Sequence, residues 1–118
     1  MIPALVALGG NIRPRRTRLE AARQALAALP GTRLEGCSTW IETAPVDAPA
    51  GSGPFLNGAC LLRTTLGPLD LLEQLLRIER DQGRIRSVRN APRVLDLDLI
   101  LHGDTVLDTP RLSLPHPR

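Results

Sequence analysis

Two carboxylates interrupt an apolar run near the C-terminal end of the chain. In APRVLDLDLILHGD, residues 91–104, Asp96 and Asp98 stand among side chains that favour a buried strand. Strand side chains alternate between the two faces, so both carboxylates leave the same face as neighbours. Like charges at that spacing repel each other, and the apolar surroundings reduce their hydration. The pattern therefore predicts a bound metal ion as the missing counterion.

An arginine-rich segment comes immediately before this acidic pair. Four arginines fall within ten residues: Arg84, Arg86, Arg89 and Arg93. Guanidinium groups suit phosphate oxygens, and Mg²⁺ prefers carboxylates together with substrate phosphates. The combination predicts metal-assisted phosphoryl transfer, with arginines stabilising charge on the transferred group. A salt-bridge network without a substrate is the alternative, and the absence of a G-x-x-x-x-G-K-[ST] motif excludes a P-loop enzyme.

Other polar positions give weaker signals. Phe55 and Asn57 share one face of a predicted strand, where a ring beside an amide could receive a flat heterocycle. A buried phenylalanine beside a capped asparagine is the alternative reading. Gly9-Gly10-Asn11 is too short for a phosphate loop, and we interpret it as a tight turn.

Composition indicates one domain of ordinary hydrophobicity. All 15 basic residues are arginines, and the formal charge of +3 favours an anionic partner only weakly. Cys37 and Cys60 show no metal-ligand spacing, so we interpret them as small buried side chains on two strands. No signal peptide or membrane-spanning run is visible, and we therefore expect a cytoplasmic protein.

The elements that must position these residues follow from the hydrophobic pattern. A helix is predicted where Leu19, Ala22, Leu26 and Leu29 recur, before Pro30-Gly31 stops it. A second helix begins at Gly67-Pro68, with a stripe of Leu69, Leu72 and Leu76 that continues to Glu79. The segment 3–11 is predicted to be a strand that runs into the tight turn at its Gly-Gly-Asn end. Further strands are predicted at 32–42, 55–65 and 94–102, with a long loop at 43–54, an arginine-rich loop at 81–93 and a hairpin through Gly103-Asp104 into 105–107.

The order β-α-β-β-α-β with an appended hairpin predicts an α+β fold. We expect a ferredoxin-like α/β sandwich, with an antiparallel sheet and both helices on one of its faces.

Four segments carry a family resemblance. ALGGN, FLNGA, RIERDQGRIR and NAPRVLDLDLILHGD…LSLPHPR, in this order and spacing, closely resemble the 6-hydroxymethyl-7,8-dihydropterin pyrophosphokinase family of the folate pathway. The resemblance implies transfer of pyrophosphate from ATP to the hydroxyl of 6-hydroxymethyl-7,8-dihydropterin, with AMP leaving and two Mg²⁺ ions assisting. It implies these two small molecules as partners, and neither nucleic acid nor a membrane.

The resemblance also implies roles for individual positions. Asp96 and Asp98 match the metal ligands, and with Arg84 and Arg93 they are the expected catalytic residues. Glu79 matches an acidic position of the family motif, whereas Leu76 replaces a glutamine that some members place near ATP. Expected nucleotide-binding positions are Arg86, Leu99, Arg111, Leu112, Ser113 and His116. Expected pterin-binding positions are Thr43, Pro45, Val46, Phe55 and Asn57.

Family members continue beyond the position of LPHPR with a further strand and helix. The resemblance therefore implies a single domain over residues 1–118 that is shortened at its C-terminal end and lacks an aromatic ring opposite Phe55. We expect a monomer with some self-association through an exposed sheet edge. Two alternatives stay open: a truncated ATP-binding remnant without full activity, and a ferredoxin-like nucleic-acid-binding module, for which Trp40 and Phe55 are the available stacking rings.

Overall fold

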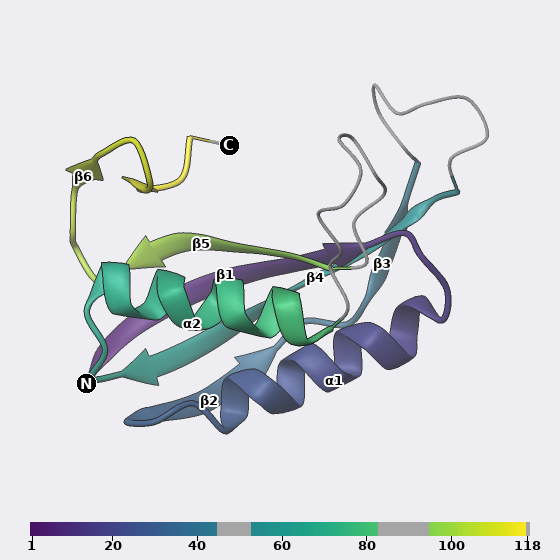
Figure 1. Cartoon of the computed structure of the whole chain (residues 1–118), viewed down its shortest axis with the longest axis horizontal. Coiled ribbons are helices and arrows are strands. Elements are labelled where there is room, and N and C mark those ends of the chain that lie inside the picture. Colours follow the sequence, from purple (N-terminus) through teal and green to yellow (C-terminus); the bar gives the residue numbers. More distant parts are fainter. Residues whose placement is uncertain (45–52, 83–94, 118) are drawn as a thin grey trace.

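The computed structural model describes residues 1–44, 53–82 and 95–117. Its elements are β1 (Ile2–Gly10), α1 (Arg15–Ala27), β2 (Thr32–Cys37), β3 (Ile41–Thr43), β4 (Phe55–Thr64), α2 (Pro68–Asp81), β5 (Asp96–His102), β6 (Leu107–Asp108) and β7 (Ser113–Leu114). The main sheet is antiparallel with the order β2-β4-β1-β5, and both helices lie on one of its faces (Figure 1). The predicted ferredoxin-like α+β fold is confirmed.

The core lies between this sheet and the two helices. Strand residues with a period of two and helix residues with a period of three to four meet there, as the hydrophobic pattern predicts. The expected stripe of α1 is buried through Leu19, Ala22 and Leu26. The sheet contributes Ala4, Val6, Leu8, Cys60, Leu62, Leu97 and Leu99 from β1, β4 and β5.

The face of α2 that packs against the core differs from the predicted one, although Glu79 belongs to both. The buried side chains are Leu71, Leu75, Ile78 and Glu79, whereas Leu69 is exposed and Leu72 and Leu76 are only partly buried. Leucine occupies five of the eight positions from 69 to 76, so a leucine pattern fits more than one face of the helix. The start at Gly67-Pro68 is confirmed, because Gly67 precedes a helix with proline in its first turn.

The strand predicted at 32–42 is two strands, β2 and β3, separated by Ser38–Trp40 and paired with different parts of β4. Ser38 bonds to Ala59 twice, donating its amide N–H to the carbonyl oxygen at 2.8 Å and accepting the Ala59 N–H on Oγ at 2.9 Å.

The Trp40 indole N–H donates to Glu20 Oε1 at 2.7 Å. This bond, followed by that from Arg23, lowers the pKa of the Glu20 carboxyl.

Two predicted turns also differ from the structure. Gly9 and Gly10 belong to β1 and pair with β4, so the chain turns after them and not at Gly-Gly-Asn. Gly103 turns the chain after β5 with φ of +54°, a left-handed conformation that glycine adopts readily. The following strand β6 does not pair with β5, however, because it forms a separate two-stranded sheet with β7. The predicted hairpin is therefore wrong.

Cys37 and Cys60 form a disulfide bridge, which corrects their interpretation as two separate small buried residues. They face each other in the register of β2 and β4, with Cα atoms 4.1 Å apart. Placing both on strands is right, but a spacing of 23 residues does not reveal that these positions oppose each other.

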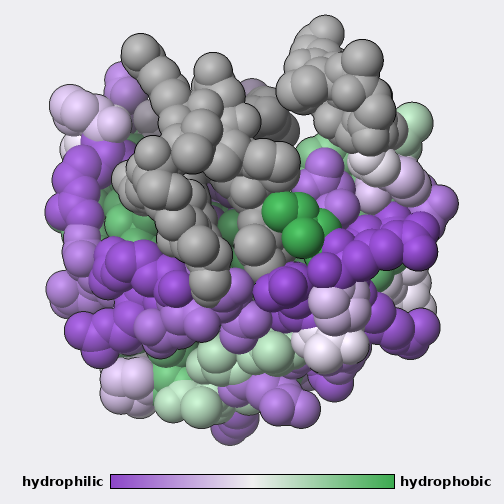
Figure 2. Space-filling view, turned by 45° about the vertical axis from the view of Figure 1, so that its right-hand side comes forward, coloured by the Kyte–Doolittle hydropathy of each residue, from purple (hydrophilic) through white to green (hydrophobic). Residues whose placement is uncertain are grey.

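Hydrophilic side chains dominate the described surface at the end of the molecule where β3 and the start of α1 lie (Figure 2). Hydrophobic areas on that face are small. Among the described residues, neither helix is long and apolar enough to cross a membrane.

Candidate active site

The two carboxylates lie on β5, the strand at one edge of the main sheet. Leu97 and Leu99 are buried toward the helices, whereas Asp96 and Asp98 are partly exposed on the opposite face. Asp96 pairs with Gly9 of β1 and Asp98 pairs with Ala7. The prediction that both carboxylates share one strand face is therefore confirmed.

Glu79 of α2 fixes the backbone between the two carboxylates. Its side chain is only 3% exposed, and its Oε2 accepts the Leu97 amide N–H at 2.8 Å. Leu97 separates Asp96 from Asp98, so this bond ties the start of β5 to the helix. A buried carboxylate needs such donors, because burial without hydrogen bonds is costly. Glu79 is thus a bracing residue beneath the acidic pair.

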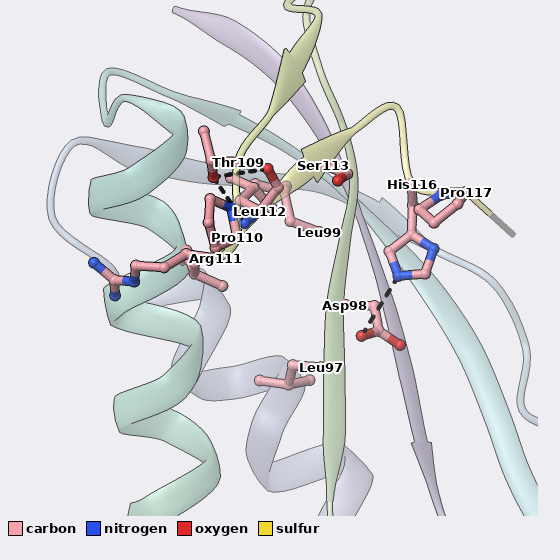
Figure 3. Close-up of a pocket in the computed structure, with 11 residues that line it drawn as sticks. Leu97, Asp98, Leu99, Thr109, Pro110, Arg111, Leu112, Ser113, His116 and Pro117 are labelled. Carbon is pink, nitrogen blue, oxygen red and sulfur yellow. Dashed lines mark hydrogen bonds and ion pairs between the residues drawn. The ribbon is translucent and has the colours of Figure 1, made fainter.

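A first cavity, which we call the C-terminal cavity, lies beside β5, the last strand in the order of the main sheet. Its volume is about 260 Å³. Figure 3 shows Asp98 and His116 turned toward each other on one side of β5, with Leu97 and Arg111 on the side of α2. The lining residues are Leu72, Leu97, Asp98, Leu99, Thr109, Pro110, Arg111, Leu112, Ser113, His116 and Pro117.

Hydrogen bonds hold the chain around this cavity. Thr109 and Leu112 close a tight turn, in which each donates to the other at 3.0 Å through the Thr109 hydroxyl and the Leu112 amide. The His116 amide N–H donates to the carbonyl oxygen of Ile100 on β5 at 2.9 Å, which brings the imidazole to 3.9 Å from Asp98 Oδ1. Arg111 pairs with the exposed Glu73 carboxylate of α2. The cavity therefore offers a guanidinium, a hydroxyl, an imidazole and a carboxylate beside apolar walls.

A second cavity, which we call the β3–β4 cavity, has a volume of about 380 Å³. Thr43 and Phe55, which line it, are register partners of β3 and β4, and Asn57 donates from Nδ2 to Thr43 Oγ1 at 2.6 Å. The lining residues are Ala7, Leu8, Gly9, Thr43, Ala44, Phe55, Asn57, Asp96 and Asp98. A ring, an amide and two carboxylates thus face one space, which could hold a flat polar heterocycle.

The acidic pair joins the two cavities. Asp98 lines both of them, and Asp96 lines the β3–β4 cavity. The expected nucleotide positions Leu99, Arg111, Leu112, Ser113 and His116 meet in the first cavity, and Thr43, Phe55 and Asn57 meet in the second. Arg84, Arg86, Arg93, Pro45 and Val46 lie outside the described residues.

Several lining residues were missed by the reasoning from sequence. Leu72, Thr109 and Pro110 belong to the C-terminal cavity, and Ala7, Leu8 and Gly9 to the β3–β4 cavity. Gly9 carried a usable signal, because glycine inside a strand often marks a close approach of another group. A Cβ atom on Gly9 would lie 2.8 Å from Asn57 Oδ1.

Comparison with known proteins decides the family. A family profile described as 7,8-dihydro-6-hydroxymethylpterin-pyrophosphokinase (HPPK) matches residues 5–118. The chain belongs to this family. As a member of the HPPK family, it is assigned to the ATP-dependent diphosphotransferases of folate biosynthesis. The remnant and nucleic-acid-binding alternatives are not favoured.

Individual relatives carry the name 2-amino-4-hydroxy-6-hydroxymethyldihydropteridine pyrophosphokinase. The chain is 47% identical to that of Pseudomonas aeruginosa over 111 residues, 94% of this chain and 68% of the relative. It is 44% identical to that of Synechocystis sp. over 115 residues, 98% of this chain and 58% of the relative. It is also 44% identical to that of Pseudomonas putida over 115 residues, 98% of this chain and 94% of the relative.

Proposed function

We propose that this chain transfers pyrophosphate from ATP to the hydroxyl of 6-hydroxymethyl-7,8-dihydropterin, with AMP as the second product. The observation that carries the proposal is that Asp98 lines both cavities, so two substrates bound side by side would meet at the acidic pair. The hydroxyl oxygen forms a bond to the β-phosphorus and loses its proton. The bond between the α,β-bridging oxygen and the β-phosphorus breaks, and AMP leaves with that electron pair.

The C-terminal cavity would bind ATP. Leu72, Leu97 and Leu99 offer apolar contacts for the adenine base, and the Ser113 hydroxyl and His116 ring can bond to ribose or phosphate oxygens. Arg111 is held by an exposed ion pair with Glu73, and exposed pairs contribute little, so a phosphate can replace that partner. Arg84, Arg86 and Arg93, which lie outside the described residues, would supply further cations toward the triphosphate.

The β3–β4 cavity would bind the pterin. The Phe55 ring can stack on the heterocycle, and the Asn57 amide can bond to its polar edge. Thr43 fixes the orientation of that amide through the bond to its hydroxyl, which is 2.6 Å long. Pro45 and Val46 belong to this side by family position. Together these groups would point the hydroxymethyl arm toward Asp96 and Asp98.

Asp96 and Asp98 fit Mg²⁺ as carboxylate ligands. The described residues contain no cluster of three or more His, Cys, Asp and Glu side chains that could hold a metal by themselves. This donor set suits Mg²⁺, which commonly binds through one or two carboxylates and completes its coordination with substrate phosphates and water. When bound, Mg²⁺ would neutralise charge on the phosphates and on the acidic pair.

The direct test is AMP release from ATP, Mg²⁺ and the pterin alcohol. We expect AMP and the pyrophosphorylated pterin to form in equal amounts, and neither to form without the pterin. AMP release that is independent of the pterin, or no turnover of the folded protein, would contradict the proposal.

Gly9→Ala tests the pterin side. The new methyl would displace the Asn57 amide, because 2.8 Å is shorter than an unstrained contact between Cβ and oxygen. We expect the pterin Kd to rise by about tenfold while the ATP Kd stays unchanged, both measured by calorimetry. Gly36→Ala is the control, since nothing lies within 4 Å of its added methyl. An unchanged pterin Kd in Gly9→Ala would place the pterin elsewhere.

We also propose that the protein is cytoplasmic and acts without nucleic acid, because both of its proposed substrates are small molecules. We propose that it is a monomer, because residues of one copy of the chain line both cavities. Size-exclusion chromatography with light scattering tests the oligomeric state.

A further inference from the structure

Arg15 is a largely buried cation that joins three segments near the β3–β4 cavity. It is the first residue of α1, and its side chain is 17% exposed. Its Nη2 donates to Glu42 Oε2 on β3 at 2.9 Å, and its Nη1 donates to the Pro54 carbonyl oxygen just before β4 at 2.9 Å. Arg15 is not among the described residues that line either cavity.

The stability of α1 does not explain why an arginine occupies its first position. The positive end of the helix dipole disfavours a cation in the first turn, and α1 has Arg15, Arg16 and Arg18 there without any acidic residue. Burial of most of the guanidinium side chain is a second cost, because arginine is mostly exposed in proteins unless it is paired. Its two bonds across to β3 and Pro54 offset both costs, so the contact itself accounts for its position.

The element that Arg15 holds is short and carries a cavity residue. Strand β3 has three residues, all exposed, and among the described strands it pairs with β4 alone. Glu42 is the middle residue of β3 and precedes Thr43, which pairs with Phe55 and accepts the bond from Asn57. A bridge from α1 to Glu42 and Pro54 therefore fastens both chain segments that carry Thr43 and Phe55.

We propose that Arg15 is a positioning residue for pterin binding. By fastening β3 to the start of β4, it keeps Thr43 against Asn57 and Phe55 and so sets the affinity for the pterin, without touching the substrate. The inference rests on the proposed function, because it assigns the β3–β4 cavity to the pterin. It predicts an effect on one substrate and not on the other.

The test compares Arg15→Ala with Arg16→Ala, which removes the same charge from the exposed neighbouring position. We expect Arg15→Ala to raise the pterin Kd about tenfold, measured by calorimetry with a non-hydrolysable ATP analogue present. The Kd of the analogue should stay unchanged, and Arg16→Ala should leave both values unchanged. Glu42→Ala should weaken pterin binding less, because the bond to Pro54 remains, and the double variant should resemble Arg15→Ala alone.

Amide hydrogen exchange supplies a readout that needs no substrate. Exchange at β3 should accelerate in Arg15→Ala while exchange in the core strand β1 stays unchanged. If the parent protein binds no pterin, the proposed function fails, and the exchange result still decides whether Arg15 fastens β3. Unchanged exchange at β3, or equal losses of pterin and nucleotide affinity, would overturn the proposal. If Arg15→Ala does not fold, Arg15→Lys replaces it, since one ammonium group cannot reproduce the two-armed bridge.

Discussion

Asp96→Ala and Asp98→Ala are each expected to lower kcat by about 10³-fold while the protein stays folded. Both carboxylates are partly exposed, so neither supplies apolar burial to the core. Each substitution relieves the repulsion between neighbouring like charges but also removes partly exposed interactions such as that of Asp98 with His116, so we expect the free energy of unfolding to change by less than about 1 kcal/mol in the absence of metal. Steady-state AMP release and urea unfolding measure the two quantities separately.

Asp104→Ala is the matched control for this pair. It removes a carboxylate from the exposed turn that follows β5, away from both cavities. We expect parental kcat and stability from this variant. If Asp98→Ala unfolds readily, or if its folded fraction keeps parental kcat, the acidic pair is structural and the assignment of the active site is wrong.

Glu79→Ala is expected to have the second largest effect, because it should lower both the free energy of unfolding and kcat. The substitution removes a buried acceptor, leaves the Leu97 N–H without this partner and opens a cavity next to β5. Leaving a buried donor unsatisfied and creating a cavity should together cost about 3 kcal/mol of unfolding free energy. Because Leu97 separates Asp96 from Asp98, we also expect kcat to fall by at least about tenfold in the folded fraction.

Two further variants distinguish the contribution of the hydrogen bond to Leu97 from the contribution of the negative charge of Glu79. Glu79→Gln keeps a side-chain oxygen that can accept the Leu97 N–H, so it should recover more than half of the lost stability. Glu73→Ala removes an exposed carboxylate from the same helix and should cost less than about 1 kcal/mol. Urea unfolding gives the free energy of unfolding of all three variants. A Glu79→Ala protein as stable as the parent would show that the bond contributes nothing.

Sequence patterns predicted the structure correctly where each pattern was compatible with only one local conformation. The alternation of Leu97 and Leu99 with Asp96 and Asp98 fixed which face of β5 is polar, and the structure agrees. Gly67-Pro68 marked the start of α2 correctly, because proline lacks the N–H that an interior helix position needs. Element order then led to the ferredoxin-like fold.

Tertiary contacts decided the features that local rules missed. The face of α2 could not be chosen among so many leucines without knowing what packs against it. Strand β6 pairs with β7 and not with β5, and Cys37 opposes Cys60 across β2 and β4, which are relations between distant segments. For the same reason, Leu72 of α2 lines the C-terminal cavity although no sequence motif marks it.

A crystal structure with the pterin alcohol, Mg²⁺ and an α,β-methylene analogue of ATP tests the central claim most directly. That claim is that two substrates meet at Asp96 and Asp98 from two adjoining cavities. We expect the pterin ring against Phe55 and Asn57, the nucleotide over β5 beside Ser113 and His116, and the β-phosphorus next to the hydroxymethyl oxygen. A pterin bound elsewhere, or a triphosphate directed away from the acidic pair, would contradict it.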